Sequence, residues 1–174
     1  ITGHASGRFV NNIIRAHGLA GVYVGGHAEP YMSRNTIAES GASGIVVEDS
    51  ARGTFSQNSI LDNVSAAVAV QGSSSPRMER NVVKHNGHGG IWLGEHAGGV
   101  FEGNDVEASP FSWRIGTEVT AKVSTTCKTA GFDAEEPTLP RIEGKFVLIQ
   151  NPGTMRGECI GSCKRKDATF DQQG

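Results

Sequence analysis

The 174-residue chain has little net charge, few aromatic residues and no cysteine before position 127. Its net charge of −2 gives no basic field of the kind that attracts nucleic acid or an anionic membrane. No apolar run approaches the roughly 18 residues of a membrane-spanning helix. Aromatic side chains are only 6% of the total. The sequence therefore predicts no nucleic-acid partner and no membrane partner.

The three cysteines lie close to the C-terminus, at Cys127, Cys159 and Cys163. Three thiolates can hold zinc, but the last two have C-x3-C spacing and no histidine follows His96. A fourth ligand would have to come from elsewhere. Free or disulfide-linked cysteines are therefore the favoured interpretation, with these three as the candidate metal ligands. We predict no cofactor.

Glycine, in contrast, is abundant, and asparagine recurs at a fixed interval. The 24 glycines indicate a fold that turns every few residues. Five asparagines follow one another at intervals of 23 residues: Asn12, Asn35, Asn58, Asn81 and Asn104. A period of this length, without insertion or deletion, is typical of stacked identical units.

Apolar residues recur in the same frame. Counted from each asparagine, they stand three before, two after, ten after and twelve after, for example Met32, Ile37, Ile45 and Val47. The last two of these positions are two residues apart, as in a half-buried strand, and the frame predicts short strands over Tyr31–Arg34, Thr36–Glu39 and Gly44–Val47 in the second unit. Three parallel strands per unit predict an all-β parallel β-helix of about five 23-residue rungs.

The asparagine column is expected to form a ladder in the turn between two strands. Asparagine tolerates a left-handed backbone, and its amide can bond to backbone groups of neighbouring units. Ile1 falls at the position that Val24 holds one unit later. We therefore expect the chain to begin within a repeat and to be part of a longer protein.

A second alternation makes a resemblance specific. Five residues before each asparagine, glycine and proline alternate, and the inward residue two positions later alternates with them: Phe9, Met32, Phe55, Met78, Phe101. The repeats resemble the right-handed, pectin-lyase-like β-helix family found in carbohydrate-binding and sugar-hydrolase-type proteins. They are most similar to the β-helix arrays of F-box proteins. That resemblance implies a right-handed solenoid inside the cell, cytoplasmic or nuclear, which recognises the protein substrates of a ubiquitin ligase.

The repeat pattern ends after Asn104, because Arg114 and Gly116 fall where inward aliphatic residues belong. We therefore predict β-helix repeats over residues 1–109 and a C-terminal cap or extension over 110–174. An open apolar layer at the end of a solenoid needs such a lid.

One column places acidic and basic groups in consecutive layers. Four residues after the asparagine stand Glu39, Asp62 and His85. Two carboxylates about 5 Å apart, with a histidine as further acid or base, could hydrolyse a glycoside. Alternatively, this position opens a turn and is solvent-exposed beside a polar neighbouring column that contains Ser40 and Asn63. These three residues are the catalytic candidates.

The outward side chains of the third strand suggest a binding face instead. They are Tyr23, Val46, Ala69 and Trp92, and tyrosine and tryptophan are types that anchor contacts. Because the rungs carry no inserted loops from which active sites are usually built, the favoured interpretation is a non-catalytic protein-interaction scaffold. The alternative is a carbohydrate-active enzyme or polysaccharide-binding module that uses the catalytic candidates.

Overall fold

A computed structural model defines the fold of this chain. It describes the backbone of residues 1–107, 111–129, 132–134, 142–145, 147–148, 159–160 and 164–165, and the side chains of 1–107 and 111–123. Every regular element in these ranges is a β-strand, and all pairings are parallel. No helix long and apolar enough to cross a membrane occurs in the described ranges. The predicted all-β parallel solenoid is confirmed.

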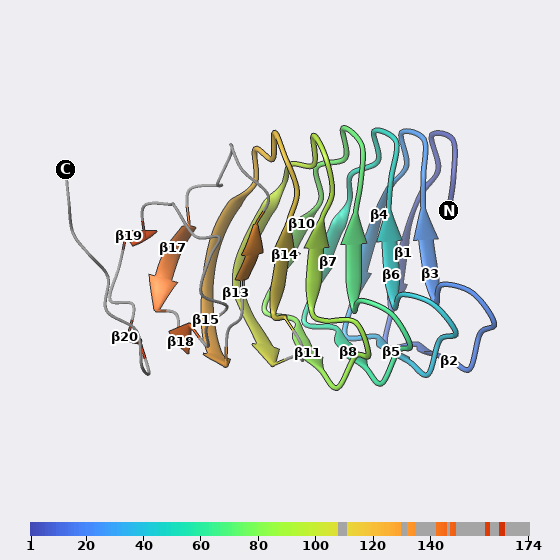
Figure 1. Ribbon diagram of the computed structural model, residues 1–174. Helices are drawn as coiled ribbons and strands as arrows, with labels where there is room; N and C mark the ends of the chain where they lie inside the picture. The colour runs from blue at the N-terminus through green and yellow to red at the C-terminus, as the bar shows by residue number, and fades with distance from the viewer. Residues whose placement is uncertain are drawn as a thin grey trace.

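Three ladders of strands make up the stack (Figure 1). The first ladder joins β1 (Ser6–Val10), β4 (Glu29–Ser33), β7 (Thr54–Ser56) and β10 (Arg77–Glu79). The second joins β2 (Ile13–Arg15), β5 (Thr36–Ala38), β8 (Ser59–Leu61) and β11 (Val82–Lys84). The long β13 (Val100–Glu107) pairs with both β10 and β11, so these two ladders form one sheet, which we call sheet A.

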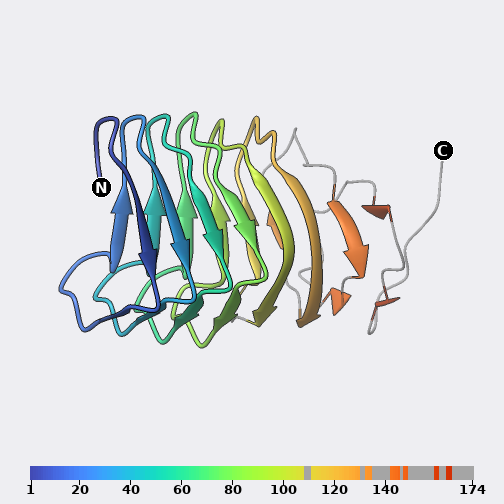
Figure 2. The ribbon, with the colours of Figure 1, turned by 180° about the vertical axis from the view of Figure 1, so that it is seen from behind.

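The third ladder is a separate sheet, which we call sheet B. Its strands are β3 (Val22–Val24), β6 (Ile45–Val47), β9 (Val68–Val70), β12 (Ile91–Leu93), β14 (Trp113–Ile115) and β16 (Phe132–Ala134). Toward the C-terminus, β15 (Lys122–Thr129), β17 (Ile142–Lys145) and β19 (Cys159–Ile160) extend sheet A, and β18 (Val147–Leu148) pairs with β20 (Lys164–Arg165). Figure 2 shows the molecule turned by 180°, so that sheet A faces the viewer with its strands side by side from β1 onward.

The core is built from columns of like side chains, one per rung. Ile14 pairs with Ile37, Ile37 with Ile60, and Val83 with both Ile60 and Val106. From Ile37 onward these side chains are fully buried. Each fully buried aliphatic side chain contributes about 1.5–3 kcal/mol by removing apolar surface from water. The column therefore joins neighbouring rungs into one continuous core.

Phenylalanine and methionine alternate in a second inward column of sheet A. Met32 lies beside Phe55, which lies beside Met78, which lies beside Phe101. All four are at most 1% exposed. The alternation that the sequence predicts therefore places a flexible thioether between two rings, which suits a narrow core.

The predicted asparagine ladder is present and closely bonded. The Asn58 Oδ1 atom accepts hydrogen bonds from the backbone N–H and the Nδ2 of Asn35, both at 2.9 Å. The Nδ2 of Asn58 donates to the Met32 carbonyl at 3.1 Å and to Asn81 Oδ1 at 3.0 Å. One detail of the prediction is wrong: the left-handed backbone belongs to the preceding residue, for example Arg34 (φ 56°), and not to the ladder asparagines.

A second, unpredicted ladder runs through the polar column that lies beside the catalytic candidates and contains Ser40 and Asn63. Ser40, Asn63 and Asn86 are at most 2% exposed. Asn63 Oδ1 accepts the Ser40 backbone N–H at 3.0 Å, and Asn86 Oδ1 accepts both the backbone N–H and the Nδ2 of Asn63. The side chains of Ser40, Asn63 and Asn86 are therefore structural and are withdrawn from solvent.

The stack continues past residue 109, where the sequence predicted that the repeats end. In the 23-residue frame Arg114 and Gly116 fall at inward positions, which suggested that the repeat fails, but in the structure Ile91 pairs with Trp113 and Leu93 with Ile115. The interval at this rung is 22 residues instead of 23, and a shift of one residue exchanges the two faces of a strand. Trp113 and Ile115 are buried, and the Trp113 ring packs edge-on against Phe101 at 5.4 Å between centroids.

Candidate functional site

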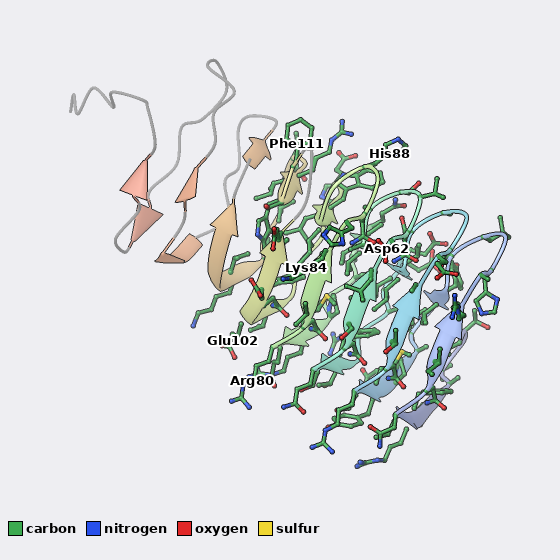
Figure 3. All side chains as sticks on the ribbon, turned by 90° about the horizontal axis from the view of Figure 1, so that it is seen from below. Asp62, Arg80, Lys84, His88, Glu102 and Phe111 are labelled. Atoms are coloured by element: carbon green, nitrogen blue, oxygen red, sulfur yellow. The ribbon has the colours of Figure 1, made fainter. Side chains whose placement is uncertain are left out.

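The three catalytic candidates lie at one corner of the solenoid, where each rung leaves sheet A. Glu39, Asp62 and His85 directly follow β5, β8 and β11 and have φ values of 55°, 54° and 55°. This left-handed conformation ends each strand and turns the chain outward. Figure 3 shows Asp62 and His88 on the side of the projecting loops, with Lys84 on the sheet beside them.

All three candidates are well exposed, with side-chain exposures of 48% for Glu39, 58% for Asp62 and 72% for His85. Both carboxylate oxygens of Glu39 accept hydrogen bonds from Arg15 Nη2, at 2.7 and 2.8 Å. Asp62 Oδ1 lies 3.7 Å from His85 Nδ1. The structure thus brings Asp62 and His85 together, whereas Glu39 is engaged by an arginine. Solvated groups of this kind lack the desolvated setting in which catalytic carboxylates are tuned.

The two binding candidates lie on the outer surface of sheet B. The outward column of this sheet is Tyr23, Val46, Ala69, Trp92 and Arg114. We call these five residues the sheet B face. Tyr23 is 39% exposed, Val46 and Trp92 are half-buried, and Ala69 is covered at 3%. From β3 to β12 the face is uncharged, and its only cation is Arg114 at the C-terminal end.

Tyr23 bends from the sheet toward the following turn, where its hydroxyl donates to the Glu48 carboxylate. Gly25 leaves room for the ring, because a Cβ atom at this position would lie 2.7 Å from the Tyr23 hydroxyl. The hydrogen bond to Glu48, together with burial and the charges of Glu48 and Asp49, raises the pKa of Tyr23 to about 12. Deprotonation would remove the donated proton and place a phenolate beside two carboxylates.

We expect a spectrophotometric titration of the tyrosines to resolve this group. One of them should ionise near pH 12, and Glu48→Gln should bring its pKa back toward the ordinary value of 10.0. The stability that this hydrogen bond contributes is present below pH 10 and is lost as the pH rises through 12. An unchanged titration curve in Glu48→Gln would contradict the contact. Glu102→Gln, which is remote from Tyr23, is the matched control.

A pocket of about 140 Å³ lies at the C-terminal end of the sheet B face. It is lined by residues of two successive rungs: Trp92, Gly94, Glu95, Arg114, Ile115, Gly116 and Thr117. The Arg114 guanidinium carbon lies 5.9 Å from the centroid of the Trp92 ring, as in a cation–π contact. Indole, carboxylate and guanidinium therefore meet around one small depression.

The turns that follow the strands of sheet B carry carboxylates. We call Glu48, Asp49, Glu95 and Glu118 the acidic edge. His96, next to this pocket, contacts two of them: its Nδ1 lies 2.7 Å from Glu118 Oε2, and its Nε2 lies 3.7 Å from Glu95 Oε1. Asp49 Oδ2 accepts the Gly26 N–H at 2.9 Å, which ties one turn to the turn before it.

The cysteine candidates lie beyond the described side chains. Cys127 and Cys159 are described only as backbone in β15 and β19, and Cys163 lies outside the described residues. The prediction that these cysteines are free or disulfide-linked, with zinc binding as the alternative, therefore stays a prediction. Within the described side chains, no group of three or more histidines, cysteines or carboxylates could hold a metal ion.

The sequence did not identify Arg114, Glu95 and Glu118 as candidate site residues. The 23-residue frame assigned Arg114 to the inside, and only the one-residue deletion before Trp113 turns it outward. The available signal was the pair Trp113 and Ile115, which repeats the spacing of Ile91 and Leu93. Aligning these two pairs would have placed Arg114 beside Trp92.

Comparison with known proteins supports the fold. The family model described as "Right handed beta helix region" matches residues 1–130. The match extends beyond residue 109 and includes β14 and all of β15, in agreement with the continued stacking. No curated protein and no solved structure matches the chain.

Proposed function

The chain belongs to the right-handed β-helix family, and from this premise we propose that it is a non-catalytic scaffold that binds a partner protein on the sheet B face. Members of one fold serve unrelated functions, so the proposal rests on the surface of this chain and not on the fold. Tyr23 and Trp92 supply the large amphipathic side chains that dominate protein–protein contacts.

The observation that carries the proposal is the uniformity of the rungs. From β1 to β13 the paired residues follow at 23-residue intervals, and no loop is inserted between them. Binding pockets for small substrates are concave and bury most of the ligand. The acidic and basic candidates on this solenoid instead lie at exposed corners, where Glu39 is held by Arg15.

A finer proposal follows from the glycine–proline and phenylalanine–methionine alternation. This alternation resembles that of the β-helix in F-box only protein 11. We therefore propose that the scaffold recognises the protein substrates of an F-box-type ubiquitin ligase, in the cytoplasm or nucleus. The support is the alternation itself, which pairs Met32 with Phe55 and Phe55 with Met78.

The second candidate function is a carbohydrate-active enzyme or a polysaccharide-binding module. It is favoured by the 3.7 Å contact between Asp62 and His85, which could orient an acid–base pair. A substrate would lie along the column that contains Glu39 and would meet three charged groups in consecutive layers.

Two assays on the full chain distinguish these functions. The first measures turnover of polyuronates and related polysaccharides by the wild type, Glu39→Gln and Asp62→Asn. The second measures capture of proteins from a cell extract by the same three proteins. We expect no turnover and the same captured proteins in all three cases. If the wild type turns over a polysaccharide and either substitution abolishes that turnover, the scaffold proposal is contradicted.

A further inference from the structure

The sheet B face has a negative edge on one side and a neutral edge on the other. The turns after its strands contain the four carboxylates of the acidic edge, the histidines His27 and His96, and no lysine or arginine. These turns are residues 25–28, 48–51, 71–74, 94–97 and 116–119. Arg52 follows the buried Ala51 and so lies past this corner. Since opposite charges attract over several ångströms at a protein surface, the edge favours a cationic neighbour.

The residues directly before the strands of sheet B carry no charge, and the Glu39 and Asp62 carboxylates lie earlier in these loops, where the chain leaves sheet A. The residues that lead into the strands of sheet B are Ala20–Gly21, Ser43–Gly44, Ala66–Ala67, Gly89–Gly90 and Phe111–Ser112. A partner on the sheet B face therefore meets apolar side chains in the centre and carboxylates along one side only. This asymmetry selects both the charge and the orientation of whatever binds.

The spacing of the edge suits an extended chain. Rungs of a parallel stack lie about 4.8 Å apart, so Glu48 and Glu95, two rungs apart, are separated along the stack by about 10 Å. Three residues of extended polypeptide span about the same distance. Side chains two or four positions apart share one side of an extended segment and are separated by about 7 or 13 Å. Long lysine and arginine side chains at such positions can therefore reach successive carboxylates of the edge.

The edge carboxylates keep capacity for such partners. Glu48 accepts the Tyr23 hydroxyl and Asp49 accepts the Gly26 N–H, but an ionised carboxylate offers about four acceptor positions. Glu95 and Glu118 lie beside His96, and their side chains are still 69% and 62% exposed. Arg114 stands in the sheet B face itself and repels cations from the centre at that end, which directs them toward the edge.

We propose that the partner is an extended polypeptide segment that is both apolar and basic. Its apolar side chains lie on Tyr23, Val46 and Trp92, and its lysines or arginines bond the acidic edge. This inference rests on the proposed scaffold function and specifies the chemistry of what that scaffold binds.

Selection from a random peptide library displayed on phage tests the proposal with the full chain as bait. We expect the enriched peptides to combine positive net charge with apolar residues, and their binding to weaken as salt concentration rises. Enriched peptides that are neutral or acidic would overturn the inference while leaving the scaffold function intact. If no peptide is enriched, the inference of an extended segment is overturned, and protein capture by the full chain then decides the scaffold function.

Matched variants locate the binding surface. The triple variant Glu48→Gln/Glu95→Gln/Glu118→Gln should weaken a selected peptide about tenfold, since exposed ion pairs change affinity by a few-fold each. The control triple variant Glu79→Gln/Glu102→Gln/Glu107→Gln makes the same charge change on sheet A and should bind as the wild type does. Trp92→Ala should weaken the peptide about thirtyfold or more. Equal affinities in the two triple variants, or full binding by Trp92→Ala, would refute the inference.

Discussion

Replacing Asn58 with alanine is expected to lower the free energy of unfolding by about 4 kcal/mol. The substitution removes two hydrogen bonds that Asn58 Oδ1 accepts from Asn35 and two that its Nδ2 donates, to Met32 and Asn81. Alanine leaves these partners buried beside a cavity that supplies neither donor nor acceptor. An unsatisfied buried polar group costs about 1–3 kcal/mol. The loss of several partners at once should therefore lower stability more than most single substitutions do.

Urea unfolding followed by circular dichroism measures this effect. The control is Asn12→Ala in the same column: Asn12 is exposed, and its side chain donates to Asn35 Oδ1 at 3.0 Å. We expect a loss of about 1 kcal/mol for Asn12→Ala. Similar losses in the two variants would mean that the ladder does not act through burial of its amides.

Replacing Phe55 with alanine is the second large expected effect, also about 4 kcal/mol, because it opens a cavity in a fully buried position. Phe55→Met should cost less than about 1.5 kcal/mol. Methionine already occupies this inward position in both neighbouring rungs, as Met32 and Met78. The core layer therefore accepts a thioether at this depth.

The same unfolding assay compares the two Phe55 variants. Because each rung of a solenoid contacts only its neighbours, a defect at Phe55 should weaken both the β4–β7 and the β7–β10 interfaces. Hydrogen exchange of the β4, β7 and β10 amides should therefore accelerate in Phe55→Ala and stay close to the wild type in Phe55→Met. Equal losses of stability in the two variants would contradict the layered core.

The fold was predictable because its information is local and repeated. Residues such as Ile37 and Ile60 stand 23 apart in the sequence and side by side in the structure. Because one residue is missing before Trp113, the 23-residue frame put Arg114 at an inward position, whereas it lies beside the outward Trp92. Side chains alternate between the two faces of a strand, so a shift of one residue exchanges them. The 23-residue period predicts which side of a strand a residue faces only where no residue is inserted or deleted.

The corners were less predictable, because a turn conformation and the burial of a polar group depend on neighbouring rungs. Asn63 and Asn86 resemble ordinary turn residues in the sequence, yet each amide bonds inside a ladder. The left-handed residues, among them Arg34 and Glu39, are mostly not glycine. Their conformation is imposed by the strands on either side.

For the candidate site, the sequence placed Tyr23 and Trp92 on the outside and Glu39, Asp62 and His85 in consecutive layers. It could not show that Glu39 is paired with Arg15, nor that a pocket forms between Trp92 and Arg114. Both depend on how side chains of adjacent rungs meet. The roles of these residues in binding or catalysis stay predictions.

Quantitative mass spectrometry of proteins captured by the full chain tests the scaffold account most directly. The bait variants are Tyr23→Ala/Trp92→Ala, which removes the two aromatic anchors of the sheet B face, and Ile13→Ala, which truncates a 75% exposed residue of sheet A. We predict that Ile13→Ala retains the proteins captured by the wild type and that the double variant loses them. Capture that survives the double variant unchanged would contradict the account.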